Sequence, residues 1–205
     1  MSNEATDQEK AKEVFRDVVA RLEDAGFDYA VGGGLSTDHW TRGVSTIGDV
    51  DLVIREEDGP PILQALARSG YETAEMDRSW LHKAFKDEVT IDLMFELKNG
   101  TRFDERFEEH RKRGELFGTV AYVIAPEDQV ASLTGTVARE TVGQHWYNIV
   151  DIMANNDLDW DYLVERAESV PLRMLSVLYF AISEKVPVRK GVIERLQELA
   201  ASSEG

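Results

Sequence analysis

The fold is decided by residues 48–54, which read Gly48-Asp49-Val50-Asp51-Leu52-Val53-Ile54. Side chains alternate along a strand, so the two aspartates point to one face while Val50 and Leu52 point into the core. The rise of a strand places the two aspartate Cα atoms ~6.6–6.8 Å apart. Two carboxylates at this spacing can converge on one small cation, and Mg²⁺ prefers such hard oxygen ligands. The alternative is a pair of solvated aspartates on an edge strand.

A glycine triplet precedes this stretch. Residues 27–31 predict a short strand that runs directly into Gly32, Gly33 and Gly34, and residues 35–40 predict a short helix. Glycine permits positive φ and lets a phosphate approach main-chain N–H groups at a helix N-terminus. Glycine triplets also make ordinary tight turns, and the G-x-G-x-x-G spacing of dinucleotide-binding folds is not met. The triplet therefore indicates phosphate binding only together with other features.

A third carboxylate interrupts an apolar segment at residues 89–95. Ile91 and Leu93 share one face of the predicted strand, while Asp92 points to the other. A lone carboxylate in so apolar a strand needs a partner. A neighbouring strand that carries Asp49 and Asp51 would supply one through a shared metal. Three carboxylates on adjacent strands can hold two metal ions, which stabilise the attacking and leaving oxygens of an in-line displacement.

The glycine turn, the D-x-D pair and the later strand aspartate together resemble the DNA polymerase β-like nucleotidyltransferase superfamily. The sequence pattern VGGG…DVDLVI and the helical tail resemble its small prokaryotic branch, the AbiEii-type and related uncharacterised nucleotidyltransferases. In the tail, Arg139 and Asp151 match a basic residue and the second acid of a D-x-x-D on a helix pair. Asn148 stands where the first aspartate often lies.

The resemblance implies transfer of a nucleoside monophosphate from an NTP to an acceptor hydroxyl, on a small molecule or a protein, with release of pyrophosphate. The catalytic and metal-binding residues it implies are Asp49, Asp51 and Asp92. They would hold two Mg²⁺ ions, with Asp92 binding the second ion or accepting the acceptor's proton. The expected nucleotide-binding residues are Gly32, Gly33, Gly34, Ser36 and Lys83. Lys83 is included because it lies in the segment that holds the cations of the middle third.

Composition restricts the partners. The 205 residues carry 39 acids and 23 bases, for a formal net charge of −16. Affinity for a long nucleic acid depends on neutralising many phosphates, so we do not expect such a partner, whereas one metal-bound nucleotide is compatible. The cations of the middle third cluster within residues 78–113, where an anionic ligand would find counter-charge; a solvated helix face over residues 102–113 is the alternative. The absence of cysteine excludes disulfides, thiolate nucleophiles and cysteine-bound metals.

The pattern predicts an α+β fold in two parts. Residues 1–125 form a nucleotidyltransferase-like domain, in which helices flank a mixed β-sheet, and residues 126–205 form a helical bundle. Strands are expected at residues 27–31, 49–54, 71–74, 81–85, 89–95 and 119–124. Helices are expected at residues 6–25, 35–40 and 60–68, and in the second part at residues 127–139, 143–155, 159–168, 171–184 and 189–200.

We expect a cytoplasmic protein without membrane association, because the polar N-terminus is unlike a signal peptide and no window approaches ~18 uninterrupted apolar residues. Two alternatives to an active enzyme stay open. One is a non-catalytic module of the same fold that senses a nucleotide or binds a partner. The other is the toxin of a toxin–antitoxin pair, whose partner would be the antitoxin. Fold analogy also suggests modification of aminoglycosides or lincosamides. The sequence leaves the acceptor, the preferred NTP and the oligomeric state open.

Overall fold

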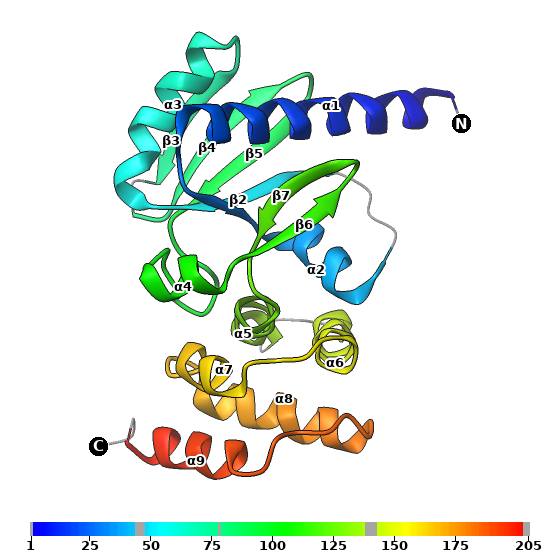
Figure 1. Cartoon of the computed structure of the whole chain (residues 1–205), viewed down its shortest axis with the longest axis vertical. Coiled ribbons are helices and arrows are strands. Elements are labelled where there is room, and N and C mark those ends of the chain that lie inside the picture. The colour runs from blue at the N-terminus through cyan, green and yellow to red at the C-terminus, as the bar shows by residue number, and fades with distance from the viewer. Residues whose placement is uncertain (1, 44–47, 78, 138–142, 203–205) are drawn as a thin grey trace. The chain divides into compact units, whose positions relative to one another are not determined.

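The computed structural model describes residues 2–43, 48–77, 79–137 and 143–202, and the chain divides into two compact units (Figure 1). The first unit contains Met1–His39, Gly43–Glu96 and Arg102–Ile124. The second contains Trp40–Arg42, Leu97–Thr101 and Ala125–Gly205. The assignment of two separate domains, divided at residue 125, stays a prediction.

A mixed seven-stranded sheet forms the centre of the first unit, in the order β3-β4-β5-β2-β1-β7-β6. The strands are β1 (Tyr29–Val31), β2 (Val50–Ile54), β3 (Glu72–Asp77), β4 (Leu81–Lys86), β5 (Val89–Met94), β6 (Lys112–Leu116) and β7 (Thr119–Val123). Strand β2 runs parallel to β5 and antiparallel to β1, and β1 runs parallel to β7. This sheet and its helices confirm the predicted α+β fold.

Helices cover both sides of the sheet. Those that belong to this part of the chain are α1 (Ser2–Ala25), α2 (Gly33–Thr41), α3 (Gly59–Arg68) and α4 (Glu105–His110), with a 3₁₀ turn, η1, at Glu56–Asp58. Helices α1 and α3 lie on one side and α2 lies on the other (Figure 1). The apolar stripe of α1 is buried, as its helical spacing predicts, and consists of Val14, Phe15, Val18, Val19 and Leu22.

The second unit is helical, in agreement with the predicted tail. Its helices are α5 (Pro126–Thr136), α6 (Gln144–Asn155), α7 (Trp160–Arg166), α8 (Pro171–Ser183) and α9 (Val192–Ser202). Proline opens α5 and α8, where its missing N–H leaves no helical bond unmade. Among the described residues, none of the helices combines the length and the apolar character that crossing a membrane requires.

The charged segment at residues 102–113 differs from the helical expectation. Helix α4 covers only Glu105–His110, and the chain then enters strand β6, which pairs with β7 at the edge of the sheet. An edge strand keeps much of its surface in water, so the sequence Lys-Arg-Gly-Glu-Leu carries no apolar signal. The strand forms because it pairs with β7, and local propensity does not indicate it.

Candidate active site

The turn between β1 and α2 is packed directly against a carboxylate of β2. Gly33 has φ +57°, and a Cβ at this residue would lie 1.9 Å from Asp51 Oδ2. The backbone conformation and the nearby carboxylate therefore both require glycine. The Gly32 N–H donates to the Asp51 carbonyl oxygen at 2.9 Å. The glycine turn thus fixes Asp51 beside the N-terminus of α2.

The N-terminus of α2 is suited to an anion. Its first intrahelical bond runs from the Ser36 N–H to the Gly32 carbonyl oxygen at 3.2 Å, so Gly33 and Gly34 lie in the first turn. N–H groups in a first turn have no partner within the helix, and the helix dipole adds positive potential there. Gly34 is exposed, whereas the Ser36 side chain is fully buried, and its Oγ has no hydrogen-bond partner among the described residues. A contact between Ser36 and a nucleotide stays a prediction.

Strands β2 and β5 bring two of the three aspartates together. Asp51 and Asp92 are direct partners in the parallel register, so both side chains point to the same face. Both residues are partly buried, while Leu52 and Leu93, the next residues along each strand, are fully buried on the opposite face. Asp49 lies just before β2 and is exposed.

The structure gives Asp92 a partner of its own. Lys83 on β4 is the antiparallel partner of Asp92, and its Nζ lies 2.5 Å from Asp92 Oδ1. The sequence instead predicts a metal ion beside Asp92 and a nucleotide beside Lys83. The sequence does contain a pattern that predicts this ion pair. A two-residue turn at Asp87 and Glu88 pairs Lys86 with Val89, and counting back along both strands pairs Lys83 with Asp92.

The number and the type of these carboxylates determine whether they could bind a metal ion. Within the described residues, no three His, Asp or Glu side chains are grouped so that they could hold one. The donor types still fit Mg²⁺, which binds proteins through one or two carboxylates and completes its shell with water and substrate phosphates. The predicted cluster of Asp49, Asp51 and Asp92 around two ions stays a prediction.

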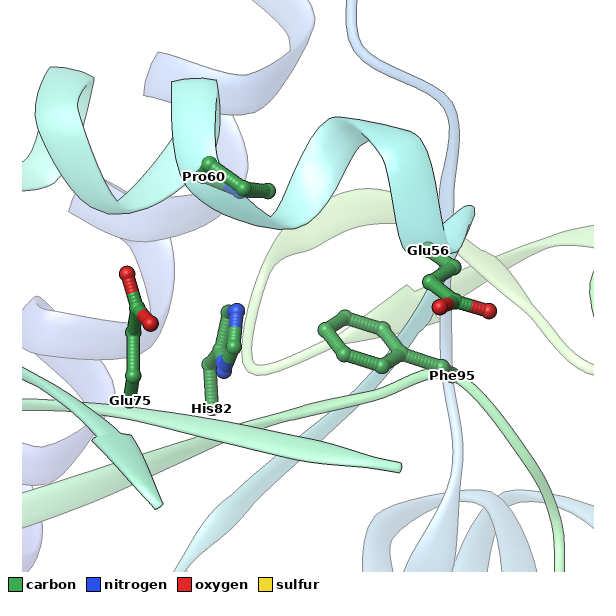
Figure 2. Close-up of a pocket in the computed structure, with 5 residues that line it drawn as sticks. All are labelled: Glu56, Pro60, Glu75, His82 and Phe95. Atoms are coloured by element: carbon green, nitrogen blue, oxygen red, sulfur yellow. The ribbon is translucent and has the colours of Figure 1, made fainter. Parts of the chain in front are cut away.

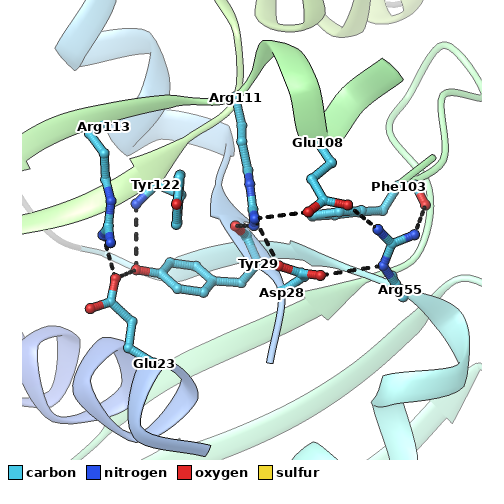
Figure 3. Close-up of polar contacts among 9 residues, drawn as sticks. All are labelled: Glu23, Asp28, Tyr29, Arg55, Phe103, Glu108, Arg111, Arg113 and Tyr122. Carbon is cyan, nitrogen blue, oxygen red and sulfur yellow. Dashed lines mark hydrogen bonds and ion pairs between the residues drawn. The ribbon is translucent and has the colours of Figure 1, made fainter. Parts of the chain in front are cut away.

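Many cations of residues 78–113 are already engaged with acids. The ion pairs are Arg102–Glu56, Arg102–Glu96, Arg106–Glu109, Arg111–Asp28 and Arg113–Glu23. Arg111 donates to Asp28 Oδ1 at 2.7 Å and to the Tyr29 carbonyl oxygen at 2.9 Å, and its guanidinium stacks 3.9 Å from the centre of the Tyr122 ring (Figure 3). Arg111, at the end of α4, and Arg113, on β6, thus bind acids next to β1 and on α1, so these two arginines contribute to the fold.

A separate cavity of about 350 Å³ is lined by Glu56, Pro60, Glu75, His82 and Phe95 (Figure 2). His82 is the strand neighbour of Lys83 and pairs with Leu93, so it points to the face opposite Asp92. Its Nδ1 lies 3.2 Å from the Leu81 carbonyl oxygen, and its ring meets that of Phe95 edge-on at 4.9 Å. The cavity is therefore not part of the carboxylate face.

Of the two tail residues that the resemblance singles out, Arg139 lies outside the described residues. Asp151 is exposed on α6. Asn148, in the position of the missing aspartate, accepts a hydrogen bond from Gln144 Nε2 at 2.9 Å. The roles of Arg139 and Asp151 stay open.

Solved structures share this fold. A lincosamide antibiotic adenylyltransferase, LnuA, with lincomycin bound, superposes with a TM-score of 0.53 at 14% identity, covering 71% of this chain and 97% of its own. An antigenic nucleotidyltransferase-like protein from Paracoccidioides brasiliensis superposes with a TM-score of 0.53 at 14% identity, covering 90% of this chain and 96% of its own. At such identity the likeness shows the fold alone.

The sequence comparisons identify the family. No curated protein matches this chain. A family model described as "Uncharacterised nucleotidyltransferase" matches residues 5–186, which is most of the chain and includes the glycine turn and all three aspartates. The protein therefore belongs to this family of uncharacterised nucleotidyltransferases, and the resemblance predicted from its motifs is confirmed.

Proposed function

We propose that the protein transfers a nucleoside monophosphate from an NTP to a hydroxyl group of a small molecule, with the help of Mg²⁺. The observation that carries the proposal is the pairing of Asp51 with Asp92 on one face, beside the glycine turn that opens α2. A helix N-terminus attracts phosphates and adjacent carboxylates attract a divalent cation, so a metal-bound triphosphate fits both features. Family membership supports nucleotidyl transfer.

The triphosphate would lie at the first turn of α2, where Gly34 is exposed and leaves the main chain open to it. Asp49 and Asp51 would hold the metal ion, and Asp49 is already exposed to solvent. When bound, the ion would supply charge neutralisation on the phosphates and on the leaving pyrophosphate. Most of the protein's contribution to such a reaction is positioning.

Asp92 would act on the acceptor. Asp92 is the register partner of Asp51, which supports a role in which its carboxylate would orient the acceptor hydroxyl and accept its proton. The class of acceptor is supported by the fold relative LnuA, which is an adenylyltransferase of lincosamide antibiotics. A protein hydroxyl is the alternative acceptor.

The test is a search for the modified acceptor. The full chain is incubated with Mg²⁺ and each of the four NTPs in a mixture of hydroxyl-bearing small molecules, and mass spectrometry looks for the added mass of a nucleoside monophosphate. The wild-type protein should produce such a product and Asp51→Asn should not. Asp24→Asn, which changes an exposed aspartate of α1 in the same way, should match the wild type. Equal product from Asp51→Asn would refute the assignment of the site.

A nucleotide-binding module without transfer is the second candidate, and the Lys83–Asp92 ion pair favours it, because that pair occupies one of the three carboxylates. In that case the protein would bind an NTP with Mg²⁺ in an equilibrium titration. No acceptor would gain mass and no pyrophosphate would be released. Product formation by the wild type would exclude this candidate.

A further inference from the structure

Asp92 and Asp49 are in unequal electrostatic states. Asp92 is contacted by the Lys83 ammonium at 2.5 Å, and only 18% of its side chain and 23% of that of Lys83 are exposed. The side chain of Asp49 is exposed, and within the described part of the chain it makes no hydrogen bond or ion pair. A cation that reaches Asp92 therefore meets a carboxylate that is already neutralised.

The sheet holds this arrangement in place. The β4–β5 register sets Lys83 opposite Asp92, and the β5–β2 register sets Asp92 beside Asp51. A one-residue slip of β4 would turn its buried residues Leu81 and Ala84 toward the wrong faces, so the register is strongly specified. The ammonium therefore cannot leave the carboxylate face by a shift of the strand.

A divalent ion that bridged Asp51 and Asp92 would lie next to the Lys83 ammonium. Like charges repel strongly where solvent screening is reduced, as it is between partly buried side chains. Lys83 already supplies the positive charge that such an ion would bring. The ion and the ammonium therefore compete for Asp92.

We infer that Lys83 is the counter-ion of Asp92 in the nucleotide-free protein and excludes a second divalent ion, so that the protein alone binds one ion, through Asp49 and Asp51. This inference rests on the proposed function, because it takes these aspartates as metal ligands. An incoming triphosphate offers the ammonium a stronger anionic partner. Lys83 then passes to a phosphate and releases Asp92, which makes Lys83 a positioning residue that couples nucleotide binding to completion of the site.

The test is an equilibrium titration of the nucleotide-free full chain with Mn²⁺, in which electron paramagnetic resonance measures free Mn²⁺. The wild-type protein should bind one ion per chain. Lys83→Met, which keeps the length of the side chain and removes its charge, should bind two, with the affinity for the second ion raised about tenfold or more. Lys83→Gln, which can still donate a hydrogen bond to Asp92, should also bind two ions.

Lys86→Met is the matched control. Lys86 lies on the same strand and forms the same kind of ion pair, from its Nζ to Asp17 Oδ2 at 2.8 Å, but it pairs with Val89 and points to the opposite face. Its substitution changes the net charge equally and should leave binding at one ion per chain. Circular dichroism of each variant verifies that it is folded.

The outcomes separate this inference from the proposed function. Equal stoichiometry and affinity in the wild type and both Lys83 variants would overturn the inference and leave the metal site standing. Two ions bound by the wild type would also overturn it. Absence of Mn²⁺ binding by every protein would overturn the metal site itself, and this inference with it.

Discussion

Gly33 and Asp51 are so close that a Cβ on residue 33 would lie 1.9 Å from the Asp51 Oδ2 atom. The two residues come from different elements, α2 and β2, and the Gly32 N–H bond to the Asp51 carbonyl oxygen holds the two segments together. The glycine turn and the carboxylate are therefore one structural unit, and a substitution in either should change the position of the other.

Gly33→Ala tests this closeness. The substitution forces a side chain into a positive-φ position and against the Asp51 carboxylate, so we expect the free energy of unfolding to fall by about 2–4 kcal/mol. Gly34→Ala is the matched control, because a Cβ there meets nothing within 4 Å and Gly34 has no positive φ. Its effect should stay within about 1 kcal/mol. Urea denaturation measures both, and equal stabilities of the two variants would contradict the close packing.

Asp17 should make stability depend on acid pH. Its carboxylate accepts hydrogen bonds from Arg21 Nε at 3.0 Å, Tyr71 Oη at 2.8 Å and Lys86 Nζ at 2.8 Å. Burial by itself raises the pKa of Asp17, but the hydrogen bonds from Arg21, Lys86 and Tyr71 outweigh it and hold that pKa well below its ordinary value. Because the folded pKa is depressed, this stabilisation is present above the unfolded pKa of ~3.9 and is lost as the pH falls toward the folded pKa.

We therefore expect Asp17→Asn to be less stable than the wild type by about 1–3 kcal/mol at pH 7. The difference should shrink below about pH 4, where the Asp17 carboxyl takes up a proton in the unfolded wild-type protein but not yet in the folded one. Denaturation curves at several pH values measure it. A difference that stays constant down to about pH 2 would show that the charge of Asp17 does not contribute.

A buried polar cluster should support the second unit. Asp128 is fully buried; the Tyr162 hydroxyl donates to its Oδ2 at 2.9 Å, and Arg166 Nε lies 3.3 Å from its Oδ1. Asp128→Ala leaves the Arg166 charge without this carboxylate, so we expect a loss of about 3–5 kcal/mol of stability. Tyr162→Phe removes the hydrogen bond from the hydroxyl to Asp128 and should cost about 1–2 kcal/mol. Thermal unfolding ranks the two variants, and the reverse order would contradict this view of the cluster.

The elements with a clear period could be predicted from the sequence. The alternation of Asp51 and Leu52 on β2, and of Asp92 and Leu93 on β5, follows from the two-residue period of a strand that is buried on one face. Helix α1 follows in the same way from its apolar stripe. Strand β6 could not be predicted, because it lies at the edge of the sheet and is mostly polar.

Contacts between distant segments could not be predicted from the sequence as readily. The ion pair of Arg111 with Asp28 joins residues 83 positions apart, and no local pattern indicates it. The burial of Ser36 depends on which side of α2 faces the sheet. This helix has only nine residues, so its hydrophobic periodicity is too weak to predict the buried side. The Lys83–Asp92 pair was within reach, because the two-residue turn between β4 and β5 sets the register of the hairpin.

The decisive measurement is the rate of pyrophosphate release as a function of Mg²⁺ concentration, with an NTP and the acceptor identified by mass spectrometry. The wild-type protein and Asp24→Asn should show the same metal-dependent rate. Asp51→Asn should be slower by about 10²–10³-fold or more, because it removes a carboxylate that holds the ion at the phosphates. A rate for Asp51→Asn equal to that of the wild type at every Mg²⁺ concentration would contradict the claim that this face of the sheet is the active site.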